Sequence, residues 1–203
     1  GHRPGEDVFI SLDVAANELH ADGRYRLGLD GSDFSSGQMV ERVADWVRRY
    51  PILSIEDPVA EDDLPGLVAF TQALGDKVQI VGDDLFVTDA DRVRDAAEQR
   101  GGNCALIKPN QRGTLTETLD ACRAAAESGY ARIVSARSGE TEDITIAHLS
   151  VGWNAGQLKV GSFSRSERMA KWNEMLRIEE VLGGKARFAG GSVLGRSAPA
   201  AKA

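Results

Sequence analysis

The chain has 203 residues, with 31 acidic and 24 basic side chains and a formal net charge of −7. Hydrophobic residues make up 42% of the chain, which is typical of globular proteins and enough to bury a core at this length. The acidic balance argues against nucleic acid as the main partner. No apolar run approaches the roughly 20 residues of a membrane span, and no signal peptide is found, so we expect no membrane partner.

The first segment, residues 1–7, is expected to be a leader, and Gly1-His2 is typical of a tag remnant. Six short apolar runs follow along the chain and are predicted to be strands buried on both faces. They are residues 8–13, 52–57, 78–83, 105–108, 131–135 and 157–161. The last segment, residues 191–203, is rich in small residues and is expected to be disordered.

Amphipathic segments separate these runs and are predicted to be helices. They are residues 36–50, 64–74, 90–100, 114–128, 142–151 and 166–182. Thr88 and Thr114 are predicted to cap the two helices that follow them, and Glu117 completes the capping pattern of Thr114. The alternation predicts the α/β class, with parallel strands and right-handed crossovers. Six strands fit either an open doubly wound sheet or part of an eight-stranded barrel.

Cys104 and Cys122 lie in apolar stretches on different predicted elements. This favours two buried, reduced thiols in a cytoplasmic protein over a disulfide.

Charged or polar residues stand at the end of every predicted strand. They are Asp13, Glu56 and Asp57, Asp83 and Asp84, Lys108, Ser135 and Arg137, and Lys159. Active sites of barrels and open α/β sheets lie at this edge, so three carboxylates are expected to converge there. Such carboxylates repel one another unless a hard divalent cation such as Mg²⁺ neutralises them.

Two lysines follow on the next strands, Lys108 and Lys159. A buried ammonium beside another cation has a lowered pKa and can serve as a base. A metal with a lysine base suits removal of a proton next to a carboxylate, and Arg137 with Ser138 suits a phosphate or carboxylate group. The plainer interpretation stays open, because a single strand-end Asp, such as Asp57 or Asp84, is more often a turn or cap residue.

Several motifs in this order resemble the enolase family, the phosphopyruvate hydratases. They are Ser54-Ile55-Glu56-Asp57-Pro58, Val81-Gly82-Asp83-Asp84, Ile107-Lys108 with Asn110-Gln111, Arg137-Ser138-Gly139-Glu140, and Gly156-Gln157-Leu158-Lys159. The resemblance extends over residues 8–190 and implies a partial enolase-type barrel without the family's N-terminal capping domain and first two barrel strands.

The resemblance also implies the roles of residues in a glycolytic lyase. Asp13, Glu56 and Asp83 would be Mg²⁺ ligands, Lys108 the base, and Lys159 a contact to the substrate carboxylate and metal. Ser135, Arg137 and Ser138 would bind the substrate. The reaction would be reversible dehydration of 2-phosphoglycerate, a small phosphorylated carboxylate, to phosphoenolpyruvate. The family also implies a homodimer, and a chain without the missing half is expected to be inactive alone.

Three residues depart from the family pattern. Ala136 stands where the family has histidine, and Pro109 and Arg112 stand where it usually has apolar residues. These changes leave two alternatives open. One is an enolase-like enzyme for a different phospho- or phosphono-carboxylate, such as a carboxyphosphonoenolpyruvate synthase. The other is a non-catalytic binding protein.

Overall fold

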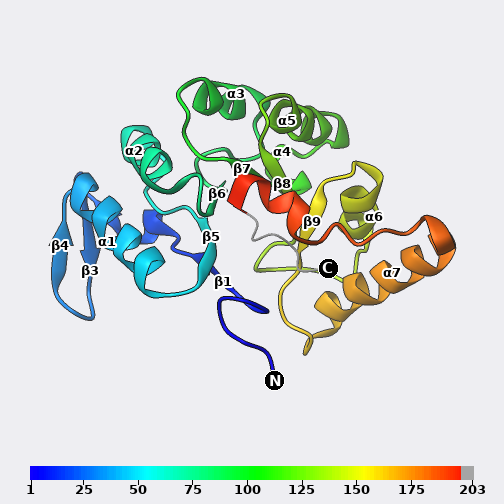
Figure 1. Ribbon diagram of the computed structural model, residues 1–203. Coiled ribbons are helices and arrows are strands. Elements are labelled where there is room, and N and C mark those ends of the chain that lie inside the picture. The colour runs from blue at the N-terminus through cyan, green and yellow to red at the C-terminus, as the bar shows by residue number, and fades with distance from the viewer. Residues whose placement is uncertain (198–203) are drawn as a thin grey trace.

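The computed structural model describes residues 1–197, in which six parallel strands form a curled sheet with helices around its outer face (Figure 1). The strand order is β1-β5-β6-β7-β8-β9. Their bounds are β1 Ile10–Asp13, β5 Ile52–Glu56, β6 Gln79–Gly82, β7 Cys104–Ile107, β8 Ala131–Ser135 and β9 Gly156–Lys159. The predicted strands and their parallel arrangement are confirmed, and the curl is that of a partial barrel.

Six longer helices agree with the predicted segments, and a short one was not predicted. They are α1 Ser36–Arg49, α2 Leu64–Leu74, α3 Ala90–Glu98, α5 Leu115–Glu127, α6 Thr145–Gly152 and α7 Ser166–Leu182, with the short α4 at Pro109–Arg112. Thr114 caps α5 as predicted, because its hydroxyl accepts from the Glu117 amide. The prediction for α3 was wrong, since its cap is Asp89, which accepts from the amides of residues 91 and 92.

A small antiparallel sheet between β1 and α1 was also not predicted. It consists of β2 His20–Ala21, β3 Arg24–Leu27 and β4 Ser32–Phe34, after the 3-10 helix η1 at Ala16–Leu19. Tyr25 of β3 anchors it, because this buried side chain donates to Asp63 at 2.8 Å and accepts from the Ala60 amide at 2.9 Å.

The curled sheet has an apolar cluster on each face. The larger cluster lies between the strands and the helices and includes Ile55, Ile80 and Ile107. The smaller one, Val81, Cys104 and Leu106, lies on the other face. Cys104 and Cys122 are both buried and free, which confirms the expected absence of a disulfide between them. No helix among the described residues is long and apolar enough to span a membrane.

The C-terminal part packs back onto the sheet. After η2 (Gly183–Lys185), the 3-10 helix η3 (Gly190–Ser197) contacts β6 and β8. Its Val193 carbonyl accepts from the side chain of Gln157 at 3.3 Å. Part of the segment expected to be disordered is therefore helical, because it finds partners on the sheet, while residues 198–203 lie outside the described residues.

Candidate active site at the carboxyl ends of the strands

The carboxyl ends of the outermost strands meet through Lys159, the last residue of β9. Its Nζ lies 2.7 and 2.8 Å from the two carboxylate oxygens of Glu56 on β5 and 3.3 Å from Asp13 on β1. In the ladder, Asp13 is the direct partner of Glu56. The curl of the sheet thus brings two predicted metal ligands and one predicted catalytic lysine together.

Asp83 and Lys108 form a second ion pair at the same edge. The Lys108 ammonium donates to one oxygen of Asp83, and the side chain of Gln111 donates to the other at 2.9 Å. Thr88 completes the arrangement, because its hydroxyl donates to the carbonyl of the Gln111 side chain and accepts from the Lys108 amide. Sequence reasoning did not single out Gln111 or this role of Thr88, although Gln111 stands in one of the quoted motifs.

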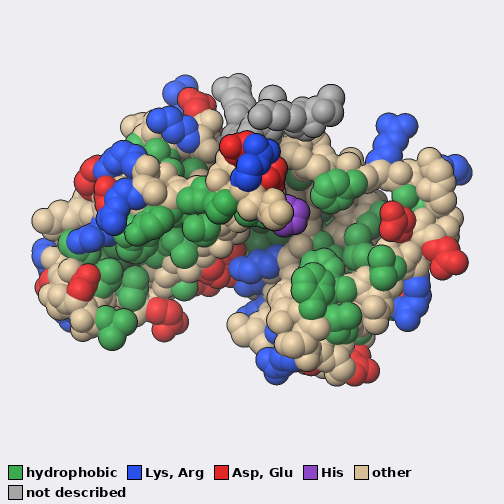
Figure 2. All heavy atoms as spheres, turned by 60° about the horizontal axis from the view of Figure 1, so that its bottom comes forward, with side chains coloured by type: hydrophobic (Ala, Val, Ile, Leu, Met, Phe, Trp, Pro, Cys, Tyr) green, Lys and Arg blue, Asp and Glu red, His purple; other side chains and the backbone are tan. Residues whose placement is uncertain are grey.

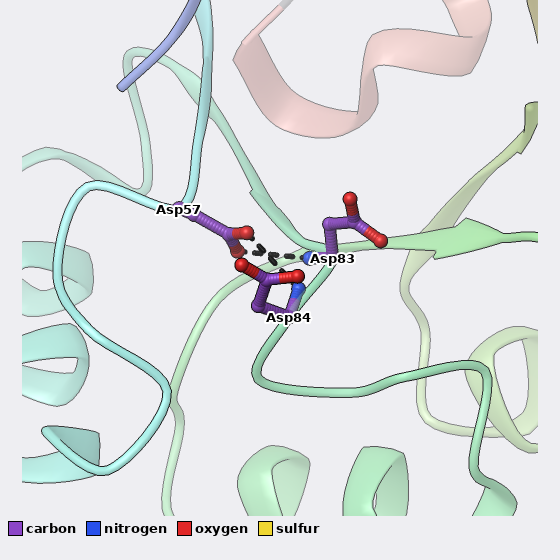
Figure 3. A group of neighbouring side chains, drawn as sticks. All are labelled: Asp57, Asp83 and Asp84. Carbon is purple, nitrogen blue, oxygen red and sulfur yellow. Dashed lines mark hydrogen bonds between the residues drawn. The ribbon is translucent and has the colours of Figure 1, made fainter. Parts of the chain in front are cut away.

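Asp57 is buried behind Asp83 and shapes the backbone there. Its two oxygens accept from the amides of Asp83 and Asp84, at 2.9 and 3.0 Å, while the Asp83 carboxylate points away from it (Figure 3). Asp84 accepts from the side chain of Asn17 at 2.9 Å. Both residues thus make the structural contacts of the plainer interpretation of Asp57 and Asp84.

The acidic residues offer oxygen ligands of the kind that Mg²⁺ prefers. Among the described residues, Asp57, Asp83 and Asp84 form the group whose oxygens lie within 4.8 Å of one another. Asp57 already accepts two amides, so it suits a ligand poorly. Asp13 and Glu56 share the Lys159 ammonium, which shows that one cation can contact both. Asp13 and Glu56 can therefore share one cation, whereas no described group of that size joins Asp83 to them, and Asp83 pairs with Lys108 instead.

Burial explains the titration behaviour of these carboxylates. It raises the pKa of Glu56 above its ordinary range, and Lys159 offsets only part of that rise. Burial likewise raises the pKa of Asp57 to about 7, against the lowering effect of the two amides. Burial lowers the pKa of Lys159, but Glu56 and Asp13 outweigh it and the net shift is upward. The lowered lysine pKa that the sequence suggested is therefore not found at Lys159, because its neighbours are acids.

The loop after β8 carries the predicted anion contacts. Ser135 is buried, and its hydroxyl donates to the carbonyl of Ala136 at 2.8 Å. The Arg137 guanidinium donates to the side chain of Asn110, two residues after Lys108, at 3.1 Å. Ser138 follows in the same loop, so this loop lies beside the segment that holds the predicted base.

The three departures from the family pattern differ in their surroundings. Pro109 is the first residue of α4, a position that suits proline. Arg112 turns to Asp89 and Glu117, at 2.7 and 3.2 Å, and thus pairs with acids of other elements. Ala136 is buried, and its amide donates to the carbonyl of Lys159 at 2.9 Å. Only Ala136 lacks a local structural reason for its identity.

A cavity of about 350 Å³ opens on the inner face of the curled sheet. Glu56, Gln79, Gln157 and Lys159 are among the residues that line it. Figure 2 shows the molecule hollowed between the part built by α1 and the small sheet and the part built by α6 and α7, with basic side chains in the hollow. Of the strand-end residues, Glu56 and Lys159 therefore line a cavity that is open to solvent on this side.

Comparison with known proteins finds a matching family and related curated proteins. The model of a family described as the C-terminal TIM barrel domain of enolase matches residues 1–197. The curated protein Enolase 1 of Desulfitobacterium hafniense (strain Y51) is 52% identical over 190 residues, which are 93% of this chain and 44% of that relative. The chain thus spans less than half the length of the curated relative that it matches.

Proposed function

This chain belongs to the enolase family, and from that premise we propose that it is the barrel portion of a Mg²⁺-dependent lyase. The reaction is the reversible dehydration of 2-phosphoglycerate to phosphoenolpyruvate and water. The observation that carries the proposal is the placement of two ion-paired groups at the carboxyl ends of the strands, Lys159 with Asp13 and Glu56, and Lys108 with Asp83.

The acidic residues Asp13, Glu56 and Asp83 would hold the metal ion. When bound, Mg²⁺ supplies neutralisation of the substrate carboxylate as negative charge builds up there during proton removal. Carboxylates buried without a cation are costly, and in this structure two ammonium groups supply the balancing charge.

The proton transfer is assigned to Lys108. Its Nζ takes the proton from C2 of 2-phosphoglycerate, the double bond forms between C2 and C3, and the hydroxyl on C3 leaves as water after receiving a proton. A lysine accepts a proton only when neutral, so Lys108 must first leave Asp83, with which it is paired here. Lys159 contacts the substrate carboxylate, and Ser135, Arg137 and Ser138 bind the substrate, the last two at its phosphate.

The acid that protonates the leaving hydroxyl is proposed to lie outside this segment, since the chain covers 44% of its relative. We therefore expect the 203-residue chain to be inactive alone and the complete enzyme to be a cytoplasmic homodimer that acts in glycolysis. The two open edges of the sheet, at β1 and β9, favour such association.

The test is a chimera that joins this chain to the part of the Desulfitobacterium relative that it does not match. We expect the chimera to form phosphoenolpyruvate from 2-phosphoglycerate, measured by absorbance, only with Mg²⁺ present. A folded chimera that binds Mg²⁺ but leaves 2-phosphoglycerate unchanged would contradict the proposal.

A second candidate substrate follows from Ala136. A methyl group at this buried position offers no hydrogen bond to substrate, which favours a related enzyme for another phospho- or phosphono-carboxylate. We expect Ala136→His to raise the rate of the chimera on 2-phosphoglycerate by about tenfold, as regaining one hydrogen bond to a charged group would. A lower rate on 2-phosphoglycerate after this change would favour the second substrate.

A further inference from the structure

The helix α7 buries charged side chains where a helix usually buries apolar ones. Its buried residues are Arg168, Lys171 and Glu174, spaced three residues apart. Lys171 is 1% exposed and Arg168 is 8% exposed. Lysine and arginine are almost never buried this far unless they are paired, so their partners show what they hold.

The Lys171 ammonium has two carbonyl acceptors and one carboxylate partner. Its Nζ donates to the carbonyls of Thr141 and Glu167, at 2.8 and 3.0 Å, and lies 2.7 Å from one oxygen of Glu140. The other oxygen of Glu140 accepts from the backbone amide of Arg137 at 2.8 Å. The buried ammonium is thereby connected, through Glu140, to the backbone of the residue that carries the predicted phosphate contact.

Arg168 holds the same loop from one turn earlier in α7. Its Nη1 donates to the carbonyls of Arg137 and Val160, at 2.8 and 2.9 Å, and its Nη2 donates to the carbonyl of Ser138 at 2.8 Å. One guanidinium thus joins the loop after β8 to the segment after β9.

The direction of these bonds matters for anion binding. Carbonyl oxygens repel an anion, and here the carbonyls of Arg137, Ser138 and Thr141 are all bound to the cations of α7. The Arg137 guanidinium meanwhile contacts Asn110, on the side of Lys108. The loop therefore keeps its acceptors on α7 and its cationic side chain toward the strand ends.

We propose that Arg168 and Lys171 are positioning residues that hold the 137–141 backbone in the conformation in which Arg137 and Ser138 bind the substrate phosphate. The inference rests on the proposed function and deepens it, since it assigns a role in substrate binding to side chains that do not touch the substrate.

The test uses the 203-residue chain with Mg²⁺ and three variants: Lys171→Met, Arg168→Lys and, as control, Glu174→Gln. Glu174 is a buried charge of the same helix that contacts His148 and Arg177 instead of the loop. Calorimetry gives the affinity for Mg²⁺ and for 2-phosphoglycerate, and hydrogen exchange gives the protection of the amides of residues 137–141.

We expect Lys171→Met to weaken 2-phosphoglycerate binding at least tenfold and to speed exchange in the loop, since a misplacement of about 1 Å can cost 10²-fold. Arg168→Lys keeps the charge but reaches fewer carbonyls, so a smaller loss is expected. Mg²⁺ affinity should stay within about twofold, because the predicted ligands lie on other strands. The control should match the unaltered chain in both affinities.

The two proposals fail in different ways. If the unaltered chain does not bind 2-phosphoglycerate, the substrate role of the loop is contradicted, whereas the proposed function is decided by the activity of the chimera. If the unaltered chain binds and the folded variants bind equally well, or their loop exchange is unchanged, only the positioning role is wrong. Should Lys171→Met not fold, Arg168→Lys decides by the same two measurements.

Discussion

The ammonium of Lys159, at the end of β9, lies 2.7 Å from a carboxylate oxygen of Glu56, at the end of β5, although 103 residues separate the two in the chain. The same ammonium contacts Asp13 of β1, 146 residues away. These contacts join one edge strand of the curled sheet to the other. The strand-end residues Asp13, Glu56 and Lys159 therefore come together only because the whole sheet is curled.

The pairing of Glu56 leads to a prediction for metal binding. At a free Mg²⁺ concentration of 100 times Kd, one bound ion raises the free energy of unfolding by about 2.7 kcal/mol. Glu56→Gln removes a charged ligand from the proposed set. Loss of a residue that only supports a metal ligand lowers metal affinity by about 10- to 100-fold, so we expect a loss of at least this size for Mg²⁺. Urea unfolding of the chain with and without Mg²⁺ measures both quantities.

The control for this prediction is Glu98→Gln, because Glu98 is exposed on α3. This variant should gain as much stability from Mg²⁺ as the unaltered chain. An equal Mg²⁺ response in Glu56→Gln would remove Glu56 from the ligand set.

Asp57 leads to a second prediction, about the backbone behind Asp83. Asn tolerates the positive φ of 42° at this position but offers only one of the two acceptors. A buried amide left without a partner costs about 1–3 kcal/mol, so we expect Asp57→Asn to lower stability by that amount. Asp57→Ala loses both acceptors and should lower it further. We also expect weaker Mg²⁺ binding, because the turn that carries Asp83 loses one of its two supports.

Urea unfolding and calorimetry of the chain give the two readouts, with the exposed Asp76→Asn as control. A variant Asp57→Asn of unchanged stability would mean that its two hydrogen bonds do not hold the turn.

Some features of the fold were readable from the sequence because they are local and repetitive. The six strands are continuous apolar runs, and the long helices show an apolar face. The small sheet escaped prediction because β2 has two residues and β4 three, too short for any periodicity to show. Thr88 was assigned to the wrong role because its hydroxyl bonds to the Lys108 amide, 20 residues away.

The candidate site likewise contains residues that the sequence predicts and residues that it does not. Strand-end residues such as Asp13, Glu56 and Asp83 could be found from position and residue type. Lys171 could not, because a lysine on a helix is expected to be solvent-exposed until its two acceptor carbonyls and its partner Glu140 are known. The sequence suggested a lowered pKa for a catalytic lysine, whereas the pKa of Lys159 is raised. The sequence alone did not show that two carboxylates lie around this lysine.

Lys108 provides a third prediction, on catalysis in the chimera. General-base catalysis contributes about 10²–10⁴ in rate, so Lys108→Ala should lower kcat by at least that factor. Lys108→Arg is the sharper variant, because arginine keeps the positive charge beside Asp83 but does not lose its proton in proteins. We expect it to be as slow as Lys108→Ala.

Stopped-flow or steady-state formation of phosphoenolpyruvate measures these rates, with the exposed Lys77→Ala as control. Near-normal turnover of Lys108→Arg would show that the residue acts through its charge and that another group takes the proton.

Asp89 yields a fourth prediction, on stability against pH, at a distance from the metal ligands. The amide of Arg92 foremost, with that of Asp91 and the charge of Arg112, lowers the pKa of Asp89 below its ordinary 3.8. A carboxylate with a lowered folded pKa stabilises the protein above the unfolded pKa, and this contribution is lost as pH falls through the folded value. Asp89→Ala, which removes the cap of α3, should lower the free energy of unfolding by about 1 kcal/mol at pH 7.

Asp89→Asn separates the cap from the charge, because asparagine still accepts from both amides but cannot attract Arg112. Its deficit relative to the unaltered chain should be smaller than that of Asp89→Ala at pH 7. This deficit should shrink as the pH falls from 3.8 through the lowered folded pKa of Asp89, because the aspartate itself then becomes protonated. Urea unfolding across this pH range gives the curve. A deficit of Asp89→Asn that stays constant with pH would show that the carboxylate charge, and with it the pair with Arg112, adds nothing to stability.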